Sequence, residues 1–347
     1  MLHQRLTSLR PRLRFRWPLP SPARWLSSAD SPYRVLFFGA DDFSCGVFRE
    51  LYKERQDLID SVTVVTPPDQ RVGRRNRELH RPRLRLLAEE LGVEAVALPP
   101  TGLKGWQPPD PFLQPSPRNL LLTASFGHMI PSTLLSLFDS TCALNVHPSL
   151  LPRWRGAAPL QWSILSGDVE AGRSGVTVQE LSAGRFDRGR LLGSEGVPDL
   201  PPDADYHDLE RRLSTVGGRL LVSVLRGGST PLDQCKEGVT LARKLGRHDV
   251  SVDFSAMTAL EAVRLQRAIG HQHPLWTRFS GSVLQMEVAP TSASLDTGSL
   301  SLVDGCLVIG CRSGAVQLIR VKREGGKWVD ACAWWNGTGR VPGFAFA

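Results

Sequence analysis

The 347-residue sequence lacks several features that would assign it to a particular class of protein. No apolar run approaches the roughly 20 residues that a membrane-spanning helix needs. The six cysteines are scattered, with no Cys-x-x-Cys pair and no histidine at metal-ligand spacing. We therefore expect no membrane partner, and reduced thiols as in the cytosol or the mitochondrial matrix. The His271-x-His273 pair has no carboxylate spaced to complete a site, so we predict no metal.

Common nucleotide-binding and catalytic motifs are also missing. The turn after the first predicted strand, residues 33–40, holds only Gly39 before Asp41 and Asp42. It therefore lacks the glycines and the electrostatics that a pyrophosphate needs, and we predict no nucleotide cofactor. The sequence has no P-loop, no His-Glu-x-x-His helix and no Gly-x-Ser-x-Gly elbow. A covalent serine intermediate is not expected.

The first 29 residues contain no acidic residue but carry six arginines and several serines. This composition is typical of an organellar transit peptide, and we predict one over residues 1–29; a basic tail that binds nucleic acid is the alternative. Its removal would lower the formal charge from +8 to +2. Net charge alone then gives no argument for a nucleic-acid partner.

Apolar runs of strand length alternate with helical periodicity over residues 33–227. This alternation predicts an α/β domain, a Rossmann-like and mostly parallel sheet with helices on both faces. Residues 228–247 are rich in glycine and charge and are predicted to be a linker. Short alternating runs in residues 248–347 predict a small C-terminal β-barrel domain.

Asn145 and His147 follow the apolar residues 142–144, which indicate a buried strand. Residues two apart on a strand share a face, so both side chains should point the same way. Polar side chains at the carboxyl end of a strand lie where α/β sheets bind ligands. An amide and an imidazole there could donate hydrogen bonds to an oxyanion. Cys142 should point to the opposite face and is not expected to be a nucleophile.

A second basic cluster follows the predicted strand 61–66, with seven arginines in residues 71–85. Because it begins at the same edge of the sheet as Asn145 and His147, phosphates bound by it would lie beside the site.

The string Ser-Leu-Leu-Pro-Arg-Trp-Arg-Gly-Ala-Ala-Pro at residues 149–159 places two arginines and a tryptophan in a loop, where they have no obvious packing purpose. It closely resembles the signature of the formyltransferases that use 10-formyltetrahydrofolate, and the tRNA formyltransferases most of all. The resemblance covers about residues 33–340. It implies 10-formyltetrahydrofolate as formyl donor, initiator methionyl-tRNA as acceptor, a monomer, and an OB-like barrel that helps to bind tRNA. With the basic amino terminus, it implies the mitochondrial matrix.

The resemblance also implies roles for individual residues. Asp187 and Gly189 match the family's Leu-Asp-Thr-Gly-Asp turn, while Phe186, Arg188 and Arg190 depart from it. Asn145, His147 and Asp187 would be catalytic. The folate-binding residues would be Ser125, Phe126, Gly127, His128, Met129, Ile130, Pro131, Ser149, Leu150, Leu151 and Pro152. The tRNA-binding residues would be Arg71, Arg74, Arg75, Arg77, Arg153 and Arg155.

Formyl transfer through a tetrahedral intermediate needs two hydrogen-bond donors for the oxyanion and one group to orient and deprotonate the amine, roles that Asn145, His147 and Asp187 can fill. The same site could serve glycinamide ribonucleotide, an amino sugar or water as acceptor. An alternative from another class is a non-catalytic RNA-binding protein. The arginine-rich segment and the C-terminal domain favour a large polyanionic acceptor.

Overall fold

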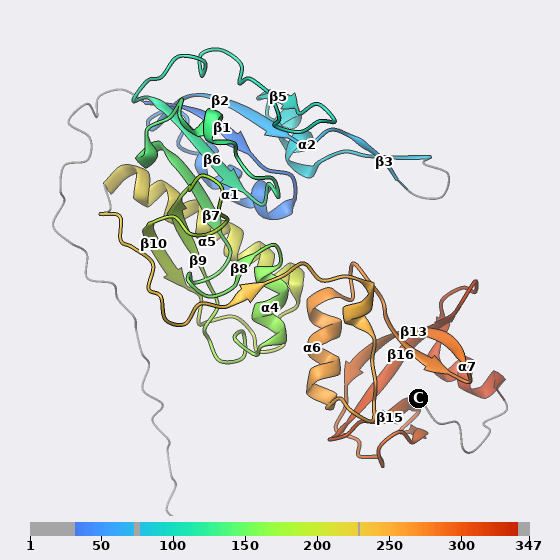
Figure 1. Ribbon diagram of the computed structural model, residues 1–347. Helices are drawn as coiled ribbons and strands as arrows, with labels where there is room; N and C mark the ends of the chain where they lie inside the picture. Colours follow the sequence, from blue (N-terminus) through green and yellow to red (C-terminus); the bar gives the residue numbers. More distant parts are fainter. Residues whose placement is uncertain (1–31, 73–76, 228–229, 339–347) are drawn as a thin grey trace, which may run out of the picture.

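A computed structural model describes residues 32–72, 77–227 and 230–338 as two domains (Figure 1). The predicted transit peptide, together with Gly73, Arg74 and Arg75, lies outside the described residues. Within them, no helix combines the length and apolar character needed to span a bilayer.

The first domain is built on a seven-stranded sheet in the order β10-β9-β7-β6-β1-β2-β5. The strands are β1 (Tyr33–Phe38), β2 (Ile59–Thr66), β5 (Glu94–Ala97), β6 (Asn119–Ala124), β7 (Ala143–His147), β9 (Gly175–Glu180) and β10 (Leu191–Gly196). Strands β7, β6, β1, β2 and β5 are parallel, whereas β9 and β10 run antiparallel to their neighbours. Every residue of β6 is buried, as expected for a strand covered on both faces. The predicted α/β fold is confirmed.

The two faces of this sheet are covered differently. Helices α1 (Asp42–Tyr52), α2 (Arg83–Glu90) and α5 (Tyr206–Gly227) pack on one face with side chains such as Val35 and Val146. The other face is covered by the connection after β5 and by the short helix α3 (Ser132–Leu135). Helix α4 (Pro159–Leu165) follows the loop after β7. The thinner cover over the second face leaves room for a cavity at the strand ends.

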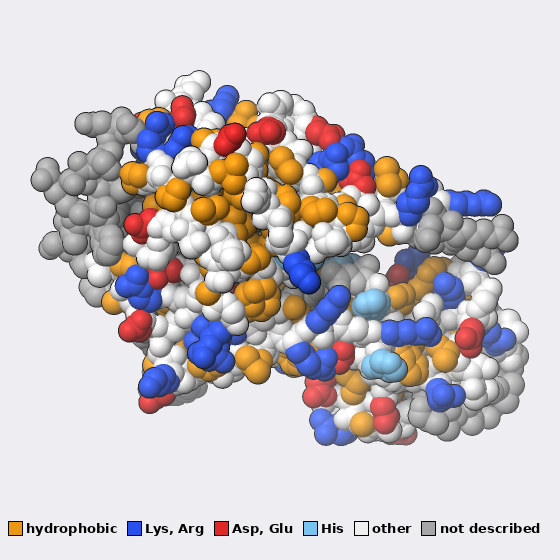
Figure 2. All heavy atoms as spheres, turned by 45° about the horizontal axis from the view of Figure 1, so that its top comes forward, with side chains coloured by type: hydrophobic (Ala, Val, Ile, Leu, Met, Phe, Trp, Pro, Cys, Tyr) orange, Lys and Arg blue, Asp and Glu red, His pale blue; other side chains and the backbone are white. Residues whose placement is uncertain are grey.

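The arginine-rich segment after β2 forms a hairpin of β3 (Gln70–Val72) and β4 (Glu78–His80), all of whose residues are exposed. It projects from the first domain as an arm (Figure 1). Lys and Arg side chains gather on this arm and beside the junction of the two domains (Figure 2). The sequence analysis identified the positive charge but not the hairpin.

The second domain contains a six-stranded sheet in the order β12-β13-β16-β15-β14, with β17 paired to β16. All of these pairings are antiparallel. The elements are α6 (Ala259–Ile269), β12 (Leu275–Phe279), β13 (Ser282–Pro290), β14 (Leu300–Val303), β15 (Cys306–Gly310), β16 (Ala315–Arg323), β17 (Val329–Asp330) and α7 (Ala331–Gly337). Trp334 and Trp335 lie in its apolar core, while Trp328 lies beneath the guanidinium of Arg320. The predicted C-terminal β domain is confirmed as an antiparallel sheet, and its OB-like barrel form stays a prediction.

The predicted linker packs along the first domain. Leu232 exchanges backbone hydrogen bonds with Leu191. Strand β11 (Leu241–Ala242) pairs in parallel with β8 (Arg155–Gly156), which lies in the loop after β7. The short helix η3 (Arg247–Val250) then leads into the second domain. This segment therefore contacts the loop that carries the 149–159 string.

Candidate active site

A row of polar side chains crosses the thinly covered face of the first-domain sheet. Asn145 on β7 is in register with Thr123 on β6 and with Gln179 on β9. His147 is two residues further along β7 and shares the face of Asn145, because strand side chains alternate. The apolar residues Leu144 and Val146 point to the opposite, helix-covered face. Strand periodicity thus places both predicted residues on one surface.

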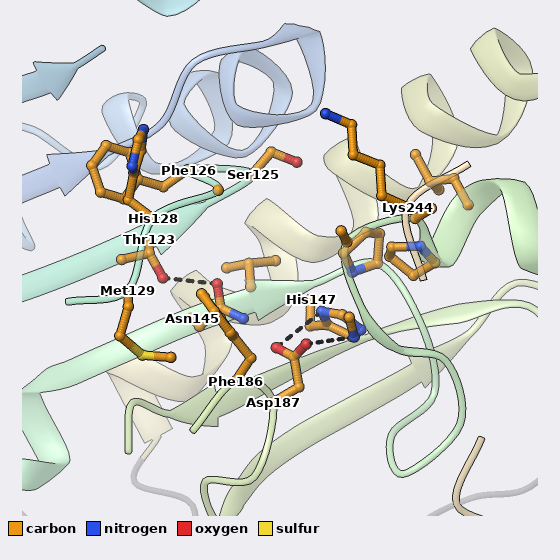
Figure 3. Close-up of a pocket in the computed structure, with 18 of the residues that line it drawn as sticks. Thr123, Ser125, Phe126, His128, Met129, Asn145, His147, Phe186, Asp187 and Lys244 are labelled. Atoms are coloured by element: carbon orange, nitrogen blue, oxygen red, sulfur yellow. Dashed lines mark hydrogen bonds and ion pairs between the residues drawn. The ribbon is translucent and has the colours of Figure 1, made fainter. Parts of the chain in front are cut away.

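The amide of Asn145 is oriented by its neighbour. Its Oδ1 accepts a hydrogen bond of 2.8 Å from the Thr123 hydroxyl. The amide nitrogen is consequently turned away from Thr123, toward the space that Asp187 and His147 also border (Figure 3). Asn145 can therefore donate to an oxygen atom in that space.

His147 is held by a backbone carbonyl. Its Nε2 lies 3.0 Å from the carbonyl oxygen of Trp154, which can only accept, so Nε2 carries the hydrogen. The other ring nitrogen, Nδ1, faces Asp187 Oδ1 at 3.4 Å. In the neutral ring, Nδ1 is an unprotonated acceptor. It donates only when the ring is doubly protonated.

Asp187 approaches His147 from the turn between β9 and β10. The residue has a left-handed φ of 54°, and its side chain is only 9% exposed. Oδ2 accepts from the Gly156 N–H at 2.8 Å, and Oδ1 accepts from Gln179 Nε2 at 3.0 Å. Gly156 has a φ of 125°, and a Cβ there would lie 2.6 Å from the carbonyl oxygen of Ala242 in β11. The carboxylate is thus held by donors from the loop after β7 and from β9.

These three side chains line a cavity of about 560 Å³. Six of the predicted folate-binding residues, from Ser125 to Ile130, also line it. Pro131, the seventh of that run, precedes α3 as its N-cap and is not among the lining residues. The volume falls in the range of roughly 300–1,000 Å³ that small-molecule sites occupy.

The other four predicted folate-binding residues, Ser149 to Pro152, do not line the cavity. The Ser149 hydroxyl donates to the carbonyl of Arg153 at 2.6 Å, and the buried Leu151 donates its N–H to Thr177 Oγ1 at 3.1 Å. These contacts shape the loop behind the site. A direct role in folate binding stays a prediction.

The signature arginines have partners inside the protein. Arg153 Nη2 donates to the buried Asp168 at 2.7 Å, and the Trp154 indole donates to the same oxygen at 2.8 Å. Burial would raise the pKa of Asp168, but these bonds and one from Arg173 hold it below its ordinary value. Arg155 donates twice to Oε1 of Gln234. The loop arginines therefore have evident roles in the fold, and their contact with tRNA stays a prediction.

Arg71 and Arg77 are exposed on the arm. Neither has an acidic partner among the ion pairs of the described residues. Both are free to meet a phosphate.

Several site residues were not found by the sequence analysis. Thr123 and Gln179 lie in predicted strands, but only the register between strands reveals that they flank Asn145. Asp41, at the amino end of α1, also lines the cavity, and burial raises its pKa to about 6. Beside the cavity, burial and the charge of Asp41 raise the pKa of Glu210 on α5, which is not a lining residue, to about 7. Gln234 contacts the turn that carries Asp187, and no motif or periodicity in the sequence indicated this.

The geometry bears on two further possibilities, a cysteine nucleophile and a metal ion. Cys142 ends the short helix η2 (Ser140–Cys142), is buried, and is not among the cavity residues; burial raises the pKa of its thiol. Among the described residues, no group of three or more His, Cys, Asp or Glu side chains is arranged to hold a metal ion.

Comparisons with known proteins match both domains. The formyl transferase family matches residues 33–225, and the formyl transferase C-terminal domain matches residues 244–339. A methionyl-tRNA formyltransferase of Mesorhizobium japonicum is 31% identical over 332 residues, covering 91% of this chain and 100% of that protein. One of Acidiphilium cryptum is 32% identical over 305 residues, covering 88% and 96%.

Solved structures share the fold at low identity. A sugar 3N-formyl transferase, WlaRD, has a TM-score of 0.58 at 14% identity and covers 84% of this chain and 98% of its own. HypX of Aquifex aeolicus, solved in complex with tetrahydrofolic acid, has a TM-score of 0.55 at 21% identity, covering 88% of this chain and 47% of its own.

Proposed function

The chain belongs to the formyl transferase family, and from this premise we propose that it transfers the formyl group of 10-formyltetrahydrofolate to the amino group of methionyl-tRNA. The observation that carries the proposal is the convergence of Asn145, His147 and Asp187 on one cavity wall, with His147 and Asp187 3.4 Å apart. The relatives of 31% and 32% identity, which bear the name methionyl-tRNA formyltransferase, support the choice of acceptor.

The first step is attack of the amine nitrogen on the formyl carbon, which converts the carbonyl oxygen into an oxyanion. The amide nitrogen of Asn145 donates to this oxygen, and such a donor is typically worth about 3 kcal/mol of barrier. His147 supplies a second donor through Nδ1 when its ring is doubly protonated, because Nε2 is occupied by the Trp154 carbonyl; the Nδ1 hydrogen is then shared between the oxyanion and Asp187 Oδ1. The charge thus develops where the site has donors.

The second step moves one proton. The attacking amine becomes positively charged and must lose a proton, and Asp187 accepts it directly or through a water. The bond between the formyl carbon and N10 of the folate then breaks, and N10 gains one proton as tetrahydrofolate leaves. One proton leaves the amine and one arrives at N10, so the protons balance. The transfer needs no covalent enzyme intermediate, because the amine attacks the formyl carbon directly.

The cavity suits a folate at its β6 end. Phe126, Met129 and Ile130 supply apolar surface, and Gly127, with φ 75°, lets the backbone approach a flat ring closely. Thr123 and Asn145 lie on the adjoining strands. The residues from Phe126 to Ile130 would hold the pteridine and present N10 to Asn145, His147 and Asp187.

The acceptor side of the site suits a polyanion. The arm of β3 and β4 follows the carboxyl end of β2 and carries the exposed Arg71 and Arg77, which have no acidic partner in the part of the chain that the structure describes. Phosphates bound there would add electrostatic affinity without base recognition. We propose that this arm binds the acceptor end of the tRNA and that the second domain supports the rest of the molecule.

We further propose that the enzyme acts in the mitochondrial matrix on the initiator tRNA. The support is the arginine-rich, acid-free composition of residues 1–29. Fusion of this segment to a fluorescent protein should direct it to mitochondria, and replacement of its six arginines by glutamine should leave it in the cytosol. Cytosolic fluorescence of the unaltered fusion would contradict the proposed location.

One assay tests the reaction. The purified protein is given 10-formyltetrahydrofolate with charged methionyl-tRNA, uncharged tRNA, glycinamide ribonucleotide or buffer, and release of tetrahydrofolate is followed. Release only with charged methionyl-tRNA is the expected result. Release in buffer would indicate a hydrolase, and release with the ribonucleotide would indicate a small acceptor. No release under any of the four conditions would refute an enzymatic role.

A further inference from the structure

We propose that Gln234, in the segment that joins the two domains, is a positioning residue that sets the orientation of the Asp187 carboxylate. This inference rests on the proposed formyl transfer. Gln234 is not among the residues lining the cavity, so any effect on the reaction must pass through its neighbours.

The carboxamide of Gln234 contacts the turn that carries Asp187. Its Nε2 lies 3.0 Å from the backbone oxygen of Asp187 and 2.8 Å from that of Gly189. Two carbonyls of one turn therefore point to a single donor group. Buried carbonyls without a partner are costly, so this amide stabilises the turn in the conformation observed.

The same amide also reaches the donors that hold the carboxylate. Gln234 Nε2 lies 3.3 Å from Oε1 of Gln179, and Gln179 in turn donates Nε2 to Asp187 Oδ1 at 3.0 Å. Asp187, Gln179 and Gln234 thus form a closed ring of hydrogen bonds. With two hydrogens for three oxygens, the Gln234 amide shares one of them, and its contact with Gln179 Oε1 favours the Gln179 orientation whose Nε2 faces the carboxylate.

On its other side, Gln234 is anchored to the signature loop. Its Oε1 accepts from Arg155 Nε at 3.1 Å and from Arg155 Nη2 at 2.5 Å. Arg155 directly precedes Gly156, whose N–H donates to Asp187 Oδ2. Gln234 therefore connects both segments that supply donors to the carboxylate.

The turn has little freedom to find another arrangement. Asp187 already has a left-handed φ of 54°, and a Cβ at Gly189 would lie 1.7 Å from the backbone oxygen of Glu180. A small displacement of this turn changes where the carboxylate points. Misplacement of a catalytic group by about 1 Å can cost about 100-fold in rate.

A purely structural role for Gln234 would make it one attachment point among several. The segment is also held by the Leu232–Leu191 pair and by the pairing of β11 with β8. These contacts do not need the amide of Gln234. Loss of that amide should therefore spare the fold and affect the rate.

The central variant is Gln234→Glu. Glutamate keeps the shape and the acceptor oxygen for Arg155 but replaces the donor by an oxygen that faces two carbonyls. We expect kcat for methionyl-tRNA formylation to fall about 10- to 100-fold, with KM for both substrates changed less than about threefold. Gln234→Leu, which removes all hydrogen bonding, should behave alike. Cys235→Ser, at the exposed neighbouring position, is the matched control and should equal the wild type.

The discriminating measurement repeats Gln234→Glu in an Asp187→Asn background. If Gln234 acts through the carboxylate, no further loss of kcat should appear in that background, because contacting residues that act as a unit are not additive. An equal loss in both backgrounds, or a Gln234→Glu kcat within about twofold of wild type, would overturn the inference. An inactive wild type would instead overturn the proposed function together with the inference built on it.

Discussion

Replacement of Asp187 by asparagine is the sharpest test of the proposed chemistry, because it keeps the shape of the side chain and removes its charge. Asparagine tolerates the left-handed φ of 54° better than most residues, whereas alanine would add a backbone cost. The new amide oxygen can still accept the Gly156 N–H. The new amide nitrogen takes the place of Oδ1, where it can donate to Nδ1 of a neutral His147 but no longer accepts from Gln179 Nε2. The variant should therefore fold, with one hydrogen bond to the side chain fewer.

The rate should fall because the site then holds no proton acceptor beside the amine. Loss of a general base costs about 10²- to 10⁴-fold, or about 3–5.5 kcal/mol of barrier. We expect kcat to fall by this factor and KM for both substrates to change less than about threefold. Rapid-quench formation of formylmethionyl-tRNA at saturating substrate measures the chemical step. A kcat within about tenfold of wild type, in a variant with an unchanged circular dichroism spectrum, would refute the role of Asp187 as proton acceptor.

Three further changes test other parts of the site and its support. Asn145→Ala removes one oxyanion donor and should lower kcat about 10²- to 10³-fold with little change in KM, as steady-state kinetics would show. Asp168→Ala leaves two partly exposed arginines and the Trp154 indole without their acceptor and should lower the free energy of unfolding by about 2–4 kcal/mol in urea titrations. Because the pKa of Asp168 is lowered in the fold, its contribution is present above about pH 4 and is lost below it, so wild type and variant should converge in acid. Glu210→Gln should raise Tm more at about pH 8 than at about pH 5. The folded-state pKa of Glu210, about 7, lies above the unfolded value, so the destabilising buried charge forms only as pH rises. An equal shift of Tm at both pH values would contradict this.

The sheet was predictable because its strands carry strong local signals. The apolar residues 119–124 and the alternating residues 174–181 end at turns and predict strands, which appear as β6 and β9. The β3–β4 hairpin was missed because its pairs, such as Arg71 with Leu79, are exposed and show no apolar alternation. The alternation of apolar and polar residues cannot reveal a strand whose side chains are all exposed.

The candidate site was predictable only where one strand defines it. Asn145 and His147 share a face by period two, and this follows from β7 alone. Thr123 and Gln179 become site residues only through the register of β6 and β9 with β7, which depends on the whole sheet. Gln234 lies in a segment whose glycine and charge indicate a linker. Its position is determined by tertiary contacts with Asp187, Gly189 and Arg155.

The boundary of the first domain therefore does not coincide with the boundary of its active site. Gly156 approaches β11 so closely that no side chain fits, and its N–H binds the Asp187 carboxylate. The Trp154 N–H is bound by Thr240, and the carbonyl of Trp154 holds His147. Both loop residues that orient His147 and Asp187 are thus fixed by the segment that leads to the second domain. The geometry of both side chains therefore depends on a segment that lies outside the α/β domain.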